Sequence, residues 1–111
     1  MPFEFGDIVL VRFPFTNQTE FKQRPAVVVS NHAYNSARPD AIIMAITSQL
    51  RAFSSVGEVW INEWQAASLL KPSVIKPVFA TIEQRLVIKP LGALQPSDQF
   101  ELRSALKDIL G

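Results

Sequence analysis

Few side chains in this sequence are of the types that most often carry out catalysis. The chain has one histidine, His32, and no cysteine. These residue types provide no ligand set for a metal ion, and they exclude a ribonuclease that works with two histidines. The four glycines are scattered instead of gathered in a phosphate-binding loop. We therefore expect no metal site, and we expect His32 to lie in a surface loop.

The composition indicates a chain that can bury a core of its own. Of the 111 residues, 48% are hydrophobic and 19% charged, and the mean hydropathy is +0.14. This length predicts one domain, residues 1–111. The formal net charge of +1 lacks the basic excess of many duplex-DNA binders. Positive charge must therefore be local if the partner is a nucleic acid.

The location of the protein follows from what the sequence lacks. It contains no run of about 18 apolar residues and no basic N-terminal region followed by an apolar stretch. The absence of cysteine fits a reducing compartment. We expect a cytoplasmic protein that does not enter a membrane.

Short runs of β-branched and aromatic residues predict a mainly β fold. Pro77 and Pro90 restrict their strands to an edge, a bulge or a break. Polar segments predict exposed loops between the first strands. Strands are expected at 6–15, 26–30, 41–47, 57–62, 73–80 and 85–91, and loops at 16–23, 31–40 and 48–56.

Two segments have helical character. Asn62 is suited to cap a short helix over 63–70, which Lys71-Pro72 would end. The C-terminal segment 96–110 begins with a proline, has Asp98 in its first turn and carries one apolar stripe. The members of that stripe are Leu102, Leu106, Ile109 and Leu110. We expect a barrel-like domain with a peripheral short helix and a C-terminal helix.

Several segments, in their order and spacing, resemble the MazF/PemK-like toxin family, and together they cover most of the chain. They are GDIVLV at 6–11, RPAVVVS at 24–30, AITS at 45–48, GEV at 57–59, WQAASLLKPS at 64–73 and LGAL at 91–94. The resemblance implies an SH3-like barrel of the MazF/CcdB kind that forms a homodimer. It also implies a toxin of a type II toxin-antitoxin system, held in check by a cognate antitoxin and meeting DNA only through that antitoxin.

The activity that the resemblance implies is cleavage of single-stranded RNA, chiefly mRNA, at short sequence motifs, with no metal and no cofactor. The 2′-OH attacks, leaving a 2′,3′-cyclic phosphate and a 5′-hydroxyl. In the family, an arginine before the proline of the second strand and a threonine at the end of the third carry the chemistry. These residues match Arg24 and Thr47.

The two side chains suit this reaction on physical grounds. Because RNA brings its own nucleophile, the protein mainly has to hold the geometry and neutralise charge. Arg24 presents a planar fork of donors to phosphate oxygens, and a guanidinium that keeps its proton acts by electrostatic stabilisation first. Thr47 can donate through a hydroxyl on a stiff side chain, with Ser48 as a helper. The alternative to a catalytic role is that Arg24 is a solvated cation in a loop and that Thr47 and Ser48 are ordinary residues at the end of a strand.

The loop before Arg24 supplies the candidates for RNA contact. It differs here from the better-known family members, so the cleavage motif does not carry over, and Glu20 aligns only loosely with an acidic helper. We interpret Phe15 as a core residue. We interpret Trp60 and Trp64 as packing residues or as contacts to a partner protein. For all three, these interpretations are preferred to stacking against RNA bases. The RNA-binding candidates are Asn17, Gln18, Phe21, Lys22 and Gln23, with Arg12 and Arg51 as added positive charge.

Two other classes of protein share this kind of barrel. A gyrase-poisoning toxin of the CcdB type binds its target through its C-terminal helix and a tryptophan near the end, which the tail Asp108–Gly111 lacks. An SH3-like module that binds RNA or a peptide without cutting is also compatible with the modest charge. An RNA cleavage assay separates the three.

Overall fold

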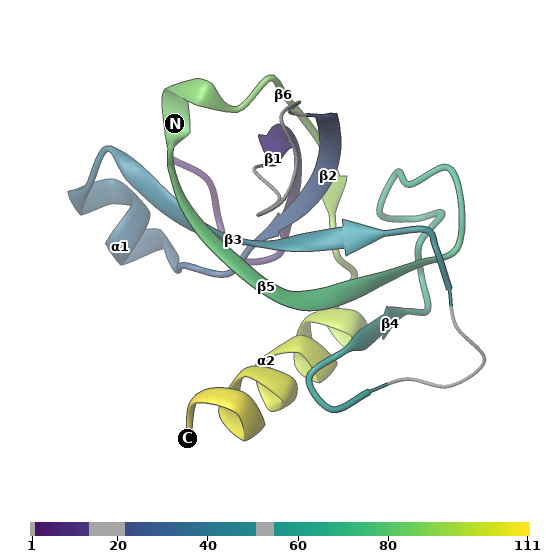
Figure 1. Cartoon of the computed structure of the whole chain (residues 1–111). Coiled ribbons are helices and arrows are strands. Elements are labelled where there is room, and N and C mark those ends of the chain that lie inside the picture. Colours follow the sequence, from purple (N-terminus) through teal and green to yellow (C-terminus); the bar gives the residue numbers. More distant parts are fainter. Residues whose placement is uncertain (1, 14–21, 51–54) are drawn as a thin grey trace.

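The computed structural model describes residues 2–13, 22–50 and 55–111, which form one curled antiparallel sheet with helices at its periphery (Figure 1). The strand order is β4-β5-β3-β2-β1-β6. The strands are β1 Asp7–Phe13, β2 Lys22–Val28, β3 Asp40–Thr47, β4 Val59–Ile61, β5 Ser73–Glu83 and β6 Lys89–Ala93. The helices are α1 His32–Ala37, the 3-10 helix η1 Gln84–Leu86 and α2 Pro96–Leu110. The mainly β architecture with a C-terminal helix confirms the predicted fold class.

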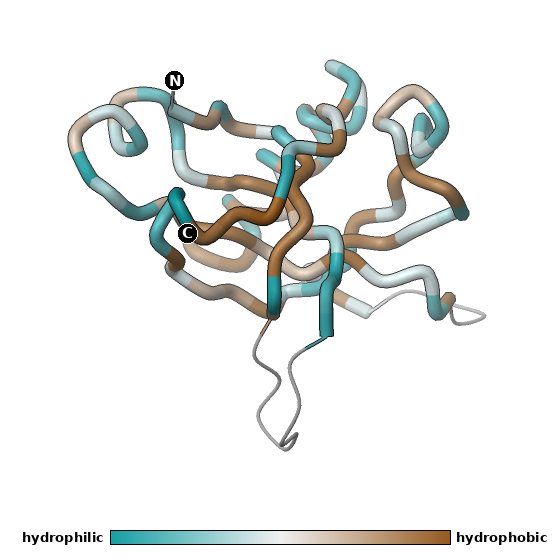
Figure 2. The backbone as a smooth tube through the Cα atoms, turned by 90° about the horizontal axis from the view of Figure 1, so that it is seen from above, coloured by the Kyte–Doolittle hydropathy of each residue, from teal (hydrophilic) through white to brown (hydrophobic). Residues whose placement is uncertain are grey.

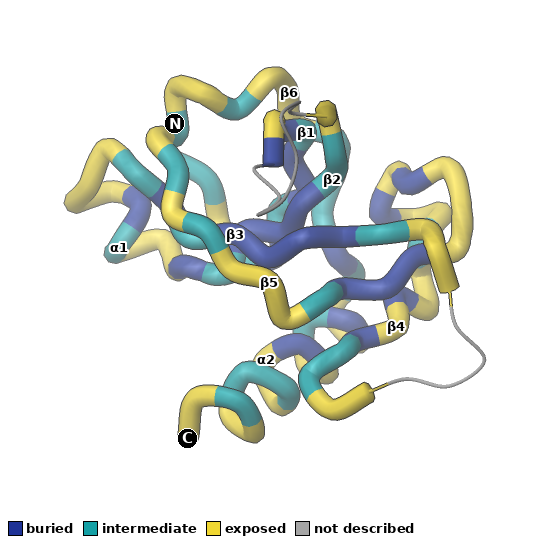
Figure 3. The backbone as a smooth tube through the Cα atoms, in the orientation of Figure 1, coloured by how far each residue is buried: buried dark blue, intermediate teal, exposed yellow. Residues whose placement is uncertain are grey.

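Each face of the sheet carries its own cluster of buried apolar side chains. Neighbouring residues of a strand point to opposite faces, so they belong to different clusters. On β1, Ile8 belongs to one apolar cluster and Val9 to the other. Leu102 of α2 joins the first cluster. Figure 3 shows that the buried stretches lie in the central strands. Figure 2 shows hydrophobic stretches in the interior of the fold as well. The all-apolar runs of β2 and β3 are thereby explained, as both strands are covered on both sides.

The two strand prolines lie where the sequence predicts. In the pairing of β3 with β5, Met44 is opposite Phe79 and Ile46 is opposite Ile75, so Pro77 lies in a bulge. Pro90 lies on β6, the edge strand, next to a second register shift. Proline has no backbone N–H, and at a bulge or on an edge strand its presence does not remove a hydrogen bond between strands.

The predicted short helix at 63–70 is wrong. This segment is a series of turns that ends at Ser68, whose φ is 67°. Asn62 does not cap it; instead the Asp98 carboxylate accepts hydrogen bonds from the backbone N–H groups of Asn62 at 3.0 Å and Glu63 at 2.9 Å. The turn therefore depends on α2, a contact that local sequence does not show.

The predicted loop at 31–40 contains helix α1, which was missed. Asn31 caps it by accepting from the backbone N–H of Tyr34 at 2.9 Å. His32 therefore opens a short helix instead of lying in a loop, and its exposed ring contacts Glu4 at 2.7 Å. The segment 85–91 also differs from prediction, because η1 ends at Leu86 and β6 begins only at Lys89.

Helix α2 has its predicted bounds, with Pro96 at its start. Leu102 is fully buried, but Leu110 is 71% exposed because the last turn extends beyond the sheet (Figure 1). The predicted stripe is therefore wrong at its last member. Of the helices in the described part of the chain, none has the length and apolar character needed to cross a bilayer.

Candidate functional site

The sheet opens between β2 and β3 where the sequence predicts the site. Their pairing runs through Val28 opposite Ile43 and ends at Ala26 opposite Ala45. Beyond that point each strand stays paired with its other neighbour, Arg24 with Val11 of β1 and Thr47 with Val74 of β5. The two strand ends therefore separate, and Figure 1 shows β2 rising away from the end of β3.

A cavity of about 470 Å³ occupies this opening, and we call it the Arg24–Thr47 groove. The four residues at the separated strand ends, Arg24 to Pro25 and Ile46 to Thr47, all line it. Pro25 has no N–H with which to hold β3, which favours the separation. The other lining residues are Leu10, Ser48, Ser68, Leu69, Leu70, Lys71, Ser73, Lys89 and Leu91.

The groove is positively charged. Arg24, Lys71 and Lys89 line it, and none of the described residues around it is acidic. Four hydroxyl groups accompany the cations. The apolar lining residues that are buried or half-buried, which we call the apolar floor, are Leu10, Pro25, Ile46, Leu69 and Leu91, whereas Leu70 is exposed. This combination suits a ligand with phosphates and flat apolar rings.

Separate elements position the two lysines. Lys89 lies on β6 opposite Leu10 of β1. Lys71 follows the turn that Asp98 anchors, and the Ser73 hydroxyl donates to its carbonyl at 2.9 Å. Ser73 is itself paired with Ile61 of β4. The segment 68–71 therefore forms part of the groove wall.

Arg24 and Thr47 lie in different local surroundings. Arg24 is partly buried and its Nε is shielded from solvent, which strengthens its interaction with an anion. The Thr47 hydroxyl oxygen accepts a hydrogen bond from the backbone N–H of Gln49 at 3.1 Å. Because a hydroxyl that accepts one bond still carries its own hydrogen, Thr47 can donate to a ligand.

The other predicted contact residues differ in where they lie. Ser48 lines the groove. Arg12 and Gln23 face each other across β1 and β2, two positions beyond the groove residues Leu10 and Pro25. Lys22 and Gln23 lie within β2 and not in the predicted loop. Asn17, Gln18, Glu20, Phe21 and Arg51 lie outside the described residues, as does Phe15.

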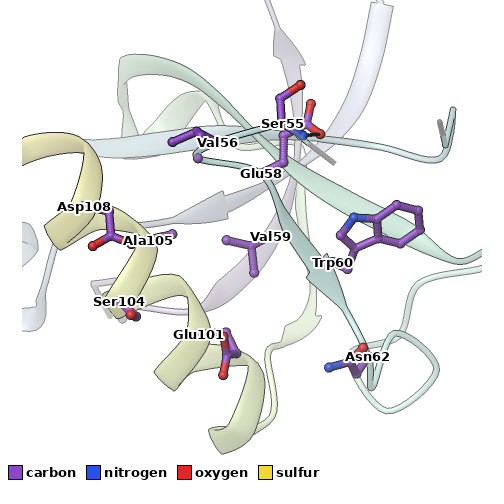
Figure 4. A pocket seen from close by; sticks show the side chains of 11 residues that line it. Ser55, Val56, Glu58, Val59, Trp60, Asn62, Glu101, Ser104, Ala105 and Asp108 are labelled. Carbon is purple, nitrogen blue, oxygen red and sulfur yellow. Dashed lines mark hydrogen bonds between the residues drawn. The ribbon is translucent and has the colours of Figure 1, made fainter. Parts of the chain in front are cut away.

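A second hollow of about the same volume, 470 Å³, lies between β4 and α2 and has the opposite charge (Figure 4). Its lining includes Glu58, Glu101 and Asp108, and no lysine or arginine is among the described residues around it. The Trp60 indole points away from α2. Glu58 pairs with Lys76, and the other two carboxylates, Glu101 and Asp108, disfavour an anionic polymer there.

Shifted pKa values lie away from the groove. Burial raises the pKa of the Asp7 carboxyl. A hydrogen bond from Arg38 lowers the pKa of Asp40, and the same contact raises the pKa of Arg38. In residues 2–13, 22–50 and 55–111, no three His, Cys, Asp or Glu side chains are grouped to hold a metal ion.

Sequence reasoning missed Lys71, Lys89 and Ser68 as groove residues. One signal was available, since both lysines directly precede a proline, as Arg24 does. A residue before proline is held extended, which projects its side chain from a stiff backbone. Arg38 and Lys76 share the pattern but pair with Asp40 and Glu58. The signal therefore needs the fold to be interpreted.

The profile of the PemK-like, MazF-like toxins of type II toxin-antitoxin systems matches residues 4–110. The chain belongs to this family. No curated protein sequence matches it. The opening of the sheet at Arg24 and Thr47 is thus a feature of a MazF-like toxin.

Solved structures share the fold of this MazF-like chain. An endoribonuclease in complex with its cognate antitoxin from a mycobacterial species has a TM-score of 0.77 at 19% identity, over 97% of this chain and 94% of that one. MazF from Deinococcus radiodurans has a TM-score of 0.72 at 23% identity, over 99% and 96%. A MazE-MazF complex from the same organism has a TM-score of 0.75 at 20% identity, over 100% and 98%. At these identities the likeness establishes the fold.

Proposed function

We propose that this MazF-like toxin is a sequence-specific endoribonuclease that cuts single-stranded RNA, chiefly mRNA, in the Arg24–Thr47 groove. The observation that carries the proposal is the charge of that groove, which brings together a guanidinium, a donor hydroxyl and two lysines with no carboxylate among its described residues. The similar mycobacterial protein described as an endoribonuclease supports it.

The reaction is transfer of the phosphoryl group to the adjacent 2′-oxygen. The 2′-OH attacks phosphorus and loses its proton, and the bond to the 5′-oxygen breaks as that oxygen gains a proton. The products are a 2′,3′-cyclic phosphate and a 5′-hydroxyl. Arg24 holds the non-bridging oxygens and stabilises the charge that develops on them. Thr47 donates to the same group, and no metal ion takes part in these roles.

The groove favours a single strand because it combines an apolar floor with separated cations. Leu10, Leu69 and Leu91 offer surface to unstacked bases, while Lys71 and Lys89 neutralise phosphates on either side of Arg24. The bases of a duplex are stacked inside it and do not reach such a floor. The positive charge that binds RNA is therefore concentrated in the groove, although the net charge of the whole chain is only +1.

We further propose that the protein is one domain over residues 1–111, acts in the cytoplasm as a homodimer, binds a cognate antitoxin and meets DNA only through it. Two of the similar structures contain an antitoxin. Exposed apolar side chains provide surface for such contacts, among them Trp60, Val78, Phe79, Leu86 and Ile88. Light scattering that shows a monomer at every concentration would contradict the dimer.

The decisive experiment is incubation of the purified protein with a long single-stranded RNA, followed by mapping of the cut positions and product ends. We expect cuts at a short motif, with cyclic phosphate ends. A second substrate carries a 2′-deoxy sugar at the mapped position and is expected to resist. Cleavage of this substrate at the normal rate would mean that water, and not the 2′-OH, attacks.

A further inference from the structure

Ser68 has a backbone conformation that usually calls for glycine. Its φ is 67°, and it is the one non-glycine residue with positive φ in the described part of the chain. Its N–H donates to the carbonyl of Gln65 and the N–H of Leu69 to that of Trp64, each at 3.0 Å. This pattern is the Schellman closure of a helical turn, in which the left-handed position is most often glycine. A serine there is strained without benefit to the turn.

The side chain of Ser68 forms part of the groove wall. Gly92 of β6 packs against this turn so closely that a Cβ at position 92 would lie 2.5 Å from the Ala67 carbonyl oxygen and 2.9 Å from the Ser68 hydroxyl. Ser68 lines the groove, exposed to solvent, beside the buried Leu69. Its strained position thus coincides with a place where a ligand would pass. A strained residue at a binding surface is a reason to look for a function of its side chain.

We propose that Ser68 and the apolar floor beside it form a nucleobase subsite, in which the Ser68 hydroxyl hydrogen-bonds the edge of a base next to the cleaved phosphate. The subsite rests on the proposed RNA cleavage and names a residue that contributes to the choice of cutting position. A hydroxyl both donates and accepts, so it can pair with an amino or a carbonyl group of a base. Leu69 and Leu91 contact the face of the base, and Lys71 binds the phosphate that follows.

Two substitutions separate this role from a structural one. Ser68→Gly relieves the backbone strain, and Ser68→Ala keeps the strain but removes the hydroxyl. We expect Ser68→Gly to melt at a higher temperature than the parent protein. Both variants should nevertheless lose about tenfold in kcat/KM at the preferred motif, the effect of one hydrogen bond. Both should also cut at additional positions of a long RNA.

The measurements are thermal melting, single-turnover cleavage and mapping of cuts on the same RNA, with Ser104→Ala on α2 as the matched control. If both Ser68 variants cut at the parent rate and positions, the subsite is wrong while RNA cleavage stands. If only Ser68→Gly loses activity, backbone geometry is responsible and the hydroxyl assignment is overturned. A parent protein that does not cut any RNA would overturn the proposed function and the subsite with it.

Discussion

Arg24 and Thr47 lie on two adjacent strands at the point where those strands part. The ladder between β2 and β3 ends at Ala26 and Ala45, which lie two residues from Arg24 and from Thr47, and both Arg24 and Thr47 line the cavity that opens there. A closed sheet would have left no room for a substrate between their side chains. The separation of the strands therefore creates the site.

Replacing Arg24 by alanine should abolish RNA cleavage without unfolding the protein. Loss of one charge-stabilising donor raises the barrier by about 3 to 4 kcal/mol, or on the order of 100-fold to 1,000-fold in rate. Lysine keeps the charge but loses the fork, so Arg24→Lys should lose most of this activity. The rate is measured in single turnover, next to circular dichroism and thermal melting.

The matched control is Arg38→Ala. Arg38 also precedes a proline, but it pairs with Asp40 outside the groove. It should cut at the parent rate. If Arg24→Ala melts like the parent and cuts like it, the site assignment is wrong; if Arg24→Ala unfolds, the residue is structural.

Thr47→Val removes a hydroxyl while preserving the shape of the side chain. We expect cleavage to fall by roughly tenfold or more, because a hydrogen bond to a charged group contributes about 1.5 to 3 kcal/mol. Thr47→Ser retains the hydroxyl and should stay within a few-fold of the parent protein. Equal rates for valine and serine at this position would rule out a donor role for Thr47.

Lys71→Gln and Lys89→Gln should weaken RNA binding more than they slow the chemical step. Each removes one phosphate contact, so the slope of log K against log salt should become shallower by about 0.7 for a single strand. The measurement is fluorescence anisotropy with a 2′-deoxy-substituted RNA that cannot be cut. Lys107→Gln, on the exposed face of α2, is the control. An unchanged slope in both groove variants would place the RNA elsewhere.

Cleavage should continue in the presence of a chelator. The mechanism we propose uses neither a metal ion nor an imidazole, so His32→Ala should also be nearly silent, its ring being exposed and in contact with Glu4. Rates with and without EDTA test the first point. Activity that EDTA removes and a divalent metal restores would overturn the mechanism.

Asp98→Ala should destabilise the fold. The carboxylate is fully buried and accepts from the backbone N–H groups of Asn62 and Glu63. Leaving these donors without an acceptor costs about 2 to 3 kcal/mol, which lowers the melting temperature by roughly 10 °C. Asp108→Ala, on the exposed side of the same helix, should melt like the parent. Equal melting of the two variants would show that the turn does not depend on Asp98.

The sequence alone determined most of the secondary structure and the family resemblance. The apolar runs at 26–30 and 41–47 predicted strands, and they lack polar alternation because a strand covered on both faces has no polar side. Because proline has no backbone N–H, Pro77 and Pro90 predicted irregular or edge positions, and they lie at a bulge and on the edge strand. For the same reason Pro96 predicted the start of α2. These features depend on local backbone chemistry, which the order of residues contains.

The tertiary structure decided how distant segments meet. The segment 63–70 has helix-forming residues, but a carboxylate from α2 and the close approach of Gly92 hold it as a turn. That turn brings Ser68 and Lys71 to the groove, and β6 brings Lys89. None of these contacts is local, so no periodicity or spacing in the sequence encodes them. The charge of the groove is a property of the curled sheet, because it exists only where β2, β3, β6 and this turn converge.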